Sequence, residues 1–380
     1  MSITRIIISV LVFFSIYGGT HYYIARRLYL WLNLLFTGMN VKVFTGLFIL
    51  LASSIILGFL PIPAVLARIF SFIGALWLGI FMYFILFFLA ADIIIFLGKI
   101  TNIIQSVTLN NVRFYSGLAV ILITFSLTVY GIYNANQIKV VNYEVVFKDS
   151  SLNNLRVVLI SDLHLGDVNS EKNLDKMIQT INNQNPDIVC LAGDIFNDNF
   201  NIIRYPDKAI DLFKDIKSKY GVYACLGNHD GGQTVNQMID FLEKSNIKLL
   251  NDEYVVIDER IALFGRLDAS PIGGFDGLQR QDISETIKNI GKDLPVIVMD
   301  HNPAHINEYG NEVNLLLAGH THKGQMFPGS LMTRVIYAVD YGHYQKDENS
   351  PHVIVTSGVS TWRPPMRIGT NNEVVSILVR

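Results

Sequence analysis

The chain has 380 residues and a formal net charge of −2, from 30 basic and 32 acidic side chains. Hydrophobic residues make up 51% of it, and its mean hydropathy of +0.35 is high for a soluble protein. The first 139 residues hold eight of the basic residues but only one of the acidic ones. The remainder has 22 basic and 31 acidic residues, a charge of −9, which argues against broad binding to a nucleic acid backbone.

Residues 1–138 form the first predicted domain, a transmembrane region. A helix needs roughly 20 apolar residues to cross a bilayer, and its backbone polar groups must be satisfied internally. Arg26 and Arg27 follow the first apolar run, and no small-residue cleavage site is evident, so this run is not interpreted as a signal peptide. About four helices are expected, over Ile6–Ile24, Val43–Leu60, Ile69–Ala90 and Ser116–Tyr133.

The distribution of Lys and Arg predicts the orientation of these spans. The loops after the first and third spans together carry five basic residues, whereas the opposite side carries three. This difference places the richer loops in the cytoplasm. An even number of spans then makes the chain a multi-pass protein of the cell membrane, with both termini and the C-terminal domain outside the cytoplasm. The two sets are Arg26, Arg27, Lys42, Lys99 and Arg113, against Arg5, Arg68 and Lys139.

Asp92 lies in the apolar run that continues past the third span. A carboxylate inside a membrane is a functional candidate, here for transport or sensing. The favoured interpretation instead puts Asp92 at the membrane surface, because residues 69–90 already suffice to span. The following stretch, Ile93–Asn111, is expected to form an interfacial helix, and Leu28–Phe36 is too short to span.

Cys190 and Cys225 are the two cysteines, and each lies in an apolar run just before a polar motif. Two buried small hydrophobic residues are favoured over a disulfide. Two cysteines do not determine the redox compartment.

Residues 139–380 form the second predicted domain, where strand and helix signals alternate as in an α/β fold. Five apolar runs of strand length end in residues that can ligate metals. In open α/β sheets ligands bind at the carboxyl ends of the strands, so strand geometry would bring these residues together. A last strand pair is expected near Val353–Val355 and Val374–Leu378. The five runs are Leu155–Ser161 before Asp162 and His164, Ile188–Ala192 before Asp194, Gly221–Leu226 before Asn228 and His229, Leu294–Met299 before His301, and Val313–Ala318 before His320 and His322.

The polar residues after these runs have the chemistry of a metal site. His320 and His322 are two residues apart, so in extended backbone both imidazoles point to one side. The whole set mixes carboxylate, amide and imidazole donors without a thiolate, which suits Mn²⁺, Fe, Zn²⁺ or Co²⁺. There are too many donors for one ion, but they suit two. Paired metals clamp a displacement at phosphorus and lower the pKa of a shared water towards about 7.

The ordered motifs resemble those of the calcineurin-like metallophosphoesterase superfamily, from the first Asp-x-His to the final Gly-His-Thr-His at Gly319–His322. The tail Thr356–Gly369 is similar to that of its bacterial membrane-anchored branch. The resemblance implies a two-sheet β-sandwich flanked by helices, with two divalent metal ions. It further implies that one metal is held by Asp162, His164 and His322, and the other by Asn228, His301 and His320. Asp194 is then the bridging carboxylate, and His229 protonates the leaving oxygen while Asp230 orients it.

Two more residues are candidate substrate contacts. Lys323 stands where the family often has glycine, so its cation could touch a phosphate or an anionic headgroup; a solvated lysine is the alternative. Arg266 lies in a Gly-Arg-x-Asp element that resembles the branch, and it contacts phosphate or forms a structural ion pair. Asp300 is interpreted as a neighbour of the site rather than a ligand.

The predicted function is that of a membrane-anchored, metal-dependent phosphohydrolase. Metal-activated hydroxide would cleave a phosphodiester or pyrophosphate, and the tether favours a lipid-linked substrate because it keeps the site close to the bilayer. One alternative is a membrane sensor or transporter whose second domain binds a ligand without catalysis. Another is a nuclease, which the charge of −9 disfavours.

Overall fold

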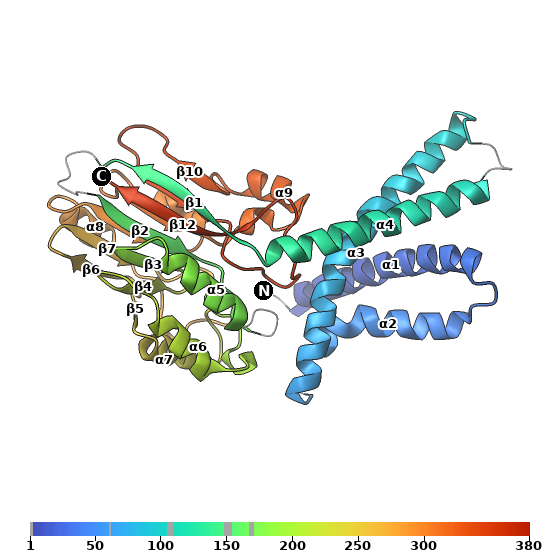
Figure 1. Cartoon of the computed structure of the whole chain (residues 1–380), viewed down its shortest axis with the longest axis horizontal. Helices are drawn as coiled ribbons and strands as arrows, with labels where there is room; N and C mark the ends of the chain where they lie inside the picture. The colour runs from blue at the N-terminus through green and yellow to red at the C-terminus, as the bar shows by residue number, and fades with distance from the viewer. Residues whose placement is uncertain (1–2, 61, 105–108, 148–153, 167–170) are drawn as a thin grey trace. The chain divides into compact units, whose positions relative to one another are not determined.

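The computed structural model describes the chain except for residues 1–2, 61, 105–108, 148–153 and 167–170 (Figure 1). Contacts between residues divide it into two compact units, Met1–Tyr130 and Gly131–Arg380. This division falls within one long helix, so the last turn of that helix belongs to the second unit. The domain boundary expected at residues 138 and 139 follows this helix in the chain and stays a prediction.

The first unit consists of apolar helices, one over each predicted span. Three of them, α1, α3 and α4, are long and apolar enough to cross a membrane, and α2 is shorter, at 17 residues. The side chain of Asn40 caps the start of α2 by accepting hydrogen bonds from the backbone N–H groups of Lys42 and Val43. The helices are α1 (Ile3–Leu35), α2 (Val41–Leu57), α3 (Ala64–Ile100) and α4 (Leu109–Ala135).

Three helices run further than predicted. Helix α4 begins at Leu109, seven residues before the predicted Ser116. Helix α1 continues to Leu35, and α3 continues to Ile100 because no proline interrupts the apolar run before Thr101. The expectation of a separate interfacial helix over Ile93–Asn111 is therefore wrong. Its first eight residues belong to α3, its last three to α4, and residues 105–108 lie outside the described part.

Asp92 is paired within this helical unit. Its carboxylate accepts a hydrogen bond of 2.6 Å from the hydroxyl of Tyr23, and Arg27 Nη2 lies 3.1 Å away. These two partners come from α1, whereas Asp92 is on α3. An ion pair between two helices accounts for the carboxylate without a transport role.

The second unit contains two six-stranded mixed sheets. Their strand orders are β1-β12-β2-β3-β4-β5 and β10-β11-β9-β8-β7-β6. The first sheet consists of β1 (Ile138–Val145), β2 (Leu155–Ile160), β3 (Ile188–Ala192), β4 (Val222–Cys225), β5 (Ile247–Leu249) and β12 (Asn372–Val379). The second consists of β6 (Glu253–Ile257), β7 (Ile261–Gly265), β8 (Val296–Met299), β9 (Leu315–Ala318), β10 (Gly342–Tyr344) and β11 (His352–Val355).

The two sheets pack face to face around a shared core. Leu159 of the first sheet and Leu317 of the second both belong to this cluster, and neither has exposed surface. Alternate residues such as Val158 face the helices on the outer side of the first sheet. Because both faces are buried, these strands read as continuous apolar runs. The helices on the outer side of the first sheet are α5 (Glu171–Asn182), α6 (Pro206–Lys214) and α7 (Val235–Lys244) (Figure 1). Helices α8 (Ser284–Ile290) and α9 (Gly329–Ile336) lie in the sequence between strands of the second sheet.

The cysteines and the last strands test two further expectations. Cys190 and Cys225 are both free and lie in the core between the sheets, so their interpretation as buried hydrophobic residues is confirmed. The expected last strand pair is wrong, because its members lie in different sheets. Strand β11 pairs in parallel with β9, whereas β12 pairs antiparallel with β2 and parallel with β1.

Candidate metal centre

Five strand ends deliver the site residues. Strands β2, β3 and β4 run parallel in one sheet, and β8 and β9 run parallel in the other. Their carboxyl ends therefore open at one edge of each sheet. The loops that follow carry the predicted residues, which are Asp162, His164, Asp194, Asn228, His229, His301, His320 and His322.

The first donor group consists of Asp162, His164 and His322, whose ligand atoms all lie within 4.8 Å of one another. Nε2 of His164 lies 3.1 Å from Nε2 of His322, and the latter atom lies 3.3 Å from Oδ1 of Asp162. All three residues are buried. The two imidazoles come from positions 158 residues apart, so the sandwich itself makes the group.

The second donor group consists of Asp194, His301 and His320, again within 4.8 Å of one another. His301 Nε2 lies 3.2 Å from Oδ2 of Asp194 and 3.3 Å from Nδ1 of His320. The amide oxygen of Asn228 lies 2.9 Å from the same His320 nitrogen. The second group thus has an amide oxygen at its edge.

Asp194 lies between the two groups. The carboxylate oxygen that faces His301 at 3.2 Å also lies 3.7 Å from Nε2 of His164 in the first group. Its other oxygen accepts a hydrogen bond of 2.9 Å from the backbone N–H of His229. That bond fixes the carboxylate, so one oxygen faces both groups.

Tight backbone turns bring these side chains inward. Asp162, Asp194 and His322 have φ angles of 57°, 53° and 48°, in the left-handed region that non-glycine residues rarely adopt. Such conformations cost about 1–3 kcal/mol each and concentrate at functional sites. Gly319 allows the close approach, because a Cβ there would lie 2.4 Å from Oδ2 of Asp162.

Burial sets the charge of the first group. It lowers the pKa of His164 to about 3 and that of His322 well below its ordinary value. Burial also raises the pKa of Asp162 to about 6, against the opposing effect of His301. Two neutral imidazole nitrogens that face each other at 3.1 Å can share only one proton. A cation between them would engage both lone pairs, so this donor set fits a divalent metal.

The second group combines a proton-binding imidazole with an anionic carboxylate. Burial opposes charge on both residues, but their proximity raises the pKa of His301 well above its ordinary value and lowers that of Asp194. Burial lowers the pKa of His320 to about 4. A metal binding here would replace the His301 proton, because ligating imidazoles are neutral.

His229 lies beside these groups but is oriented by a residue that was not predicted. Its Nδ1 lies 2.5 Å from Oδ1 of Asp198, and its ring centroid is 5.2 Å from that of His164. Burial lowers the pKa of His229, but the contact with Asp198 outweighs this effect and raises it overall. The signal in the sequence was a second aspartate four residues after Asp194.

The expected orienting role of Asp230 is contradicted by its hydrogen bonds. Its carboxylate accepts bonds of 2.8 Å from the backbone N–H groups of Phe196 and Gly227, on two separate loops. It has no exposed surface, and burial raises its pKa to about 7. Asp230 therefore holds the loops together, and Asp198 holds the imidazole of His229.

The two expected substrate contacts, Arg266 and Lys323, have different surroundings. Arg266 is 4% exposed, and its guanidinium lies 3.0 Å from Asp252 and donates to the carbonyl of Gln281. These contacts favour the alternative of a structural ion pair, and the phosphate contact stays a prediction. The Lys323 ammonium lies 3.8 Å from the ring centroid of Tyr341, and its role in binding substrate stays a prediction.

Asp300 forms a network away from the donor atoms, as expected for a neighbour of the site. Its carboxylate lies 2.7 Å from Arg280 Nη2 and accepts a hydrogen bond of 2.7 Å from the hydroxyl of Tyr309.

Arg367 is a second residue that the sequence did not reveal. It is completely buried, and burial lowers its pKa to about 10. Its guanidinium donates to the carbonyl of His322 at 3.0 Å, and its Nη2 lies 3.2 Å from Nδ1 of that imidazole. It also donates to Oδ1 of Asn372 at 2.7 Å. Arg367 thus fixes the ring orientation of one candidate metal ligand.

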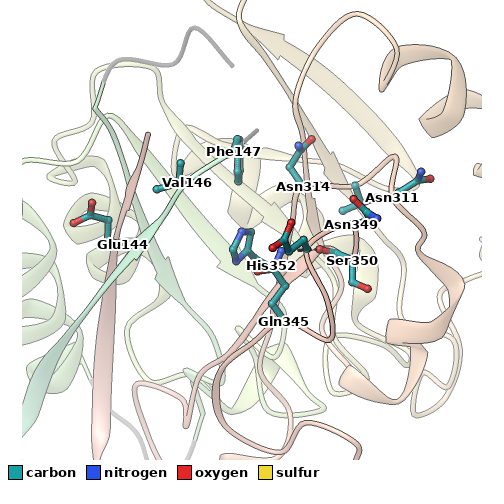
Figure 2. A pocket seen from close by; sticks show the side chains of 11 residues that line it. Glu144, Val146, Phe147, Asn311, Asn314, Gln345, Asn349, Ser350 and His352 are labelled. Carbon is teal, nitrogen blue, oxygen red and sulfur yellow. Dashed lines mark hydrogen bonds between the residues drawn. The ribbon is translucent and has the colours of Figure 1, made fainter. Parts of the chain in front are cut away.

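One cavity of the second unit lies away from the donor groups. It measures about 610 Å³ and is lined by polar side chains such as Asn314, Gln345 and Asn349 around His352 (Figure 2). Asn314 immediately precedes β9 and His352 begins β11, whereas the donor residues follow the other ends of such strands. None of the donor residues lines this cavity, so volume alone does not locate the chemistry.

Two sheets that gather two carboxylate and imidazole groups at their strand ends define an α/β protein with a candidate dinuclear metal centre. A model of the calcineurin-like phosphoesterase family matches residues 155–324. An uncharacterized metallophosphoesterase of Aquifex aeolicus is 30% identical over 227 residues, which are 60% of this chain and 85% of that protein. The chain therefore belongs to the calcineurin-like metallophosphoesterase family, whose members use two divalent metals.

Two other relatives extend the comparison. An uncharacterized metallophosphoesterase of Campylobacter jejuni is 31% identical over 227 residues, which cover 58% of this chain and 58% of that protein. A transmembrane protein with metallophosphoesterase domain from Danio rerio is 27% identical over 323 residues, covering 80% of this chain and 72% of its own. The second match is longer than the Gly131–Arg380 unit, so it extends into the helical unit.

Proposed function

We propose that this chain is a membrane-anchored, metal-dependent phosphoesterase that hydrolyses a phosphodiester or pyrophosphate. The proposal rests on the position of Asp194, one oxygen of which lies 3.2 Å from His301 and 3.7 Å from His164. A carboxylate shared by two donor groups is what a pair of divalent ions needs.

The proposed ligands divide between the two ions. Asp162, His164 and His322 would hold one, and Asn228, His301 and His320 would hold the other, with Asp194 shared. When bound, the cations would polarise the phosphoryl oxygens and lower the pKa of a water molecule. Two observations support this assignment. The ligand atoms of each three-residue donor group lie within 4.8 Å of one another, and the pKa values of His164, His320 and His322 are lowered.

His229 is proposed to supply a proton to the leaving oxygen. Asp198 engages Nδ1, which leaves Nε2 for the substrate, and the contact with Asp198 raises the pKa of the ring, which favours its protonated form. The backbone N–H of His229 donates to Asp194, and this hydrogen bond fixes the position of the shared carboxylate relative to the proposed proton donor. Trp362, whose ring centroid is 5.4 Å from that of His229, is 41% exposed and would border the substrate.

A lipid-linked substrate is favoured by the way the end of α4 joins the site. Asn134, in the last turn of α4, donates hydrogen bonds to the carbonyls of Arg367 and Thr370, and Arg367 in turn contacts His322. One short segment therefore connects a helix long and apolar enough to cross a membrane with a candidate metal ligand. If α4 spans the membrane, a site joined to its end is close enough to the bilayer to reach phosphates at its surface.

The activity is tested with the purified full-length chain in detergent, loaded with Mn²⁺, on a generic aryl phosphodiester. Turnover by the wild type and its loss in Asp194→Asn would support the proposal, provided that the variant retains the wild-type unfolding temperature in the presence of EDTA. If the Asp194→Asn protein hydrolyses the diester at the wild-type rate, the proposed function is wrong. Cys190→Ser is a matched control, because that residue is buried in the core rather than at the site.

The extracytoplasmic orientation is proposed from the distribution of Lys and Arg, and it has its own test. Cys190 and Cys225 are buried, so a cysteine introduced at exposed Lys248 would be the reactive thiol of the second unit. A membrane-impermeant maleimide should label Lys248→Cys on intact cells. Labelling only after the membrane is permeabilised would reverse the orientation.

A further inference from the structure

Helix α9 begins five residues after Gly324, at the end of the loop that carries His322, and it has no buried residue. Five large apolar side chains on it or just before it are exposed to between 49% and 86%. Those on the helix are spaced as one face, while Thr333 turns away and donates to Asp340. We call these five the α9 face: Phe327, Leu331, Met332, Val335 and Ile336.

The α9 face adjoins the donor groups. The start of the helix is pressed against the site loop, because a Cβ on Gly324 would lie 2.2 Å from the backbone carbon of Gly329. Tyr337, at the other end of the helix, has its ring centroid 5.9 Å from that of His320. One end of the helix thus lies against the loop of His322 and the other lies near His320.

The α9 face is also tied to the end of α4. The backbone N–H of Phe327 donates to the carbonyl of Ile368 at 2.8 Å. In the same segment, the N–H of Arg367 donates to the carbonyl of Gly131 in α4 at 3.0 Å. A single stretch of backbone therefore lies between Phe327 and the last turns of α4, and all of these residues belong to the second unit.

We propose that the α9 face lies in the interfacial layer of the bilayer and admits the acyl chains of a lipid-linked phosphoester to the donor groups. If α4 spans the membrane, its end marks the bilayer surface, and the hydrogen bonds above hold the α9 face next to it. Exposed apolar patches of this kind mark interaction sites, and flanking cations such as Arg334 suit the headgroup region. This inference rests on the proposed function, since it names the substrate class of the same site.

The location is tested without activity. Full-length Val335→Cys and Lys248→Cys proteins are labelled with an environment-sensitive fluorophore and reconstituted in vesicles that contain doxyl-labelled lipids. The label at position 335 should be quenched and that at 248, on an exposed part of β5, should not. Equal quenching at the two sites would overturn the proposal, as would quenching at 335 that depends on protein density, which would indicate a second copy on the α9 face.

The role of the α9 face in binding a lipid-linked substrate is tested by placing negative charges on it. Val335→Asp with Ile336→Asp should lower turnover of a lipid-linked diester in vesicles by about tenfold, because the apolar anchor is lost. Turnover of a soluble aryl diester should stay unchanged, and Val335→Leu with Ile336→Leu should behave as wild type on both. Equal loss on both substrates, or on neither, would refute the role of the α9 face. Failure of the wild type on both substrates would instead refute the proposed function, while the quenching result would still stand.

A separate observation in the helical unit carries a second proposal. A cavity of about 340 Å³ is lined by Arg26 and Arg27 of α1 and by Asn110 and Arg113 of α4, with apolar walls that include Trp31. Arg27 is paired with Asp92, which is the only acidic residue among the first 139. The described residues that line the cavity include three arginines and no acidic residue, and of the three only Arg27 has an ion pair with Asp92, so the cavity has an excess of positive charge.

We infer that this cavity binds the phosphate of an anionic phospholipid. Charged groups at membrane depth need a counterion, and basic pockets between helices supply binding sites for lipid headgroups. The guanidinium groups would engage the phosphate, and Leu30 and Leu34 would contact the upper acyl chain. All three arginines lie on helices and are among the basic residues whose distribution predicts the cytoplasmic side, where anionic lipids are enriched.

The cavity is tested by the unfolding temperature of the full-length chain in neutral detergent during titration with lipids. An anionic phospholipid should raise that temperature at lower concentrations than a zwitterionic one, and Arg26→Gln with Arg113→Gln should remove the difference. Arg5→Gln, at an exposed position near the start of α1, should retain it. An equal response to inorganic phosphate, or no preference in the wild type, would overturn the inference.

Discussion

Oδ1 of Asp198 lies 2.5 Å from Nδ1 of His229, and this contact holds the imidazole beside the two donor groups. Arg363 Nη2 lies 3.5 Å from the other oxygen of the same carboxylate. An imidazole held through Nδ1 presents Nε2 to its surroundings, and the carboxylate stabilises the protonated ring. Asp198 is therefore a positioning residue for the proposed proton donor.

Replacing that carboxylate should slow catalysis without unfolding the protein. We expect Asp198→Asn to lower kcat on an aryl phosphodiester by about a hundredfold, since general acid catalysis contributes about 10²–10⁴-fold. The KM should change little, because the donor groups remain. Steady-state kinetics of the full-length chain, combined with its unfolding temperature, measure both effects.

The matched control is Asp230→Asn, which changes the same functional group at the residue that follows His229 in sequence. Asp230 accepts from the backbone N–H groups of Phe196 and Gly227, so the variant should lower the unfolding temperature. A kcat loss in Asp230→Asn equal to that in Asp198→Asn, at unchanged stability, would return the positioning role to Asp230.

The strand ends could be predicted because burial on both faces makes each strand a continuous apolar run. Val157 and Leu159 face one core while Val158 and Ile160 face another, so no polar residue interrupts β2 between Arg156 and Ser161. Strand β1 was missed because its exposed positions break that pattern. Its place is set by parallel pairing with β12, where Ile138 lies opposite Asn372, and no local signal encodes this partner.

Asp198 and Arg367 could not be assigned for a related reason. An aspartate in a loop and an arginine in a proline-rich tail have many ordinary roles. Arg367 acquires its role only because the tail returns to His322 across 45 residues and is buried there. Ligand identity follows strand ends and motif spacing, whereas the contacts that orient ligands depend on loops that meet only in the folded chain.

Arg266 should be structural. We expect Arg266→Met to lower the free energy of unfolding by about 3 kcal/mol, because it leaves the buried carboxylate of Asp252 without its cation. The KM of the folded enzyme for an aryl phosphodiester should stay unchanged. Lys323→Met should cost less than about 1 kcal/mol, the scale of a cation–π contact. A large rise in KM for Arg266→Met, without loss of stability, would restore the phosphate contact.

Arg367 should control metal affinity. Arg367→Lys cannot reproduce the forked contacts to His322 and Asn372, and partners that orient ligands typically account for 10–100-fold in affinity. We therefore expect the Kd for Mn²⁺, measured by calorimetry on the EDTA-treated full-length protein, to rise by about 10-fold or more. Arg156→Lys is the control, since that side chain contacts Ser376 rather than a donor residue. Equal affinity in the wild type and Arg367→Lys would contradict the orienting role.

The imidazole pair of His343 and His352 should make stability depend on pH. Nε2 of His343 lies 2.9 Å from Nδ1 of His352, and burial lowers the pKa of both rings, with mutual repulsion adding to the effect at His352. Because the folded pKa values lie below the unfolded value of 6.5, the unfolded chain takes up protons first as the pH falls. The contribution of the pair to the free energy of unfolding is complete at pH values above 6.5. It is lost as the pH falls from 6.5 towards the pKa values of the folded state.

Denaturant unfolding of the full-length chain in detergent at pH 7.5 and 5.5 measures this loss. The pKa values of His164, His320 and His322 are also lowered, whereas that of His301 is raised, so the informative quantity is the difference between the wild type and His352→Gln. The variant removes one titrating ring and relieves the other of its charged neighbour. It should therefore lose less stability between the two pH values than the wild type does. An equal loss in the two proteins would assign the pH dependence to other groups.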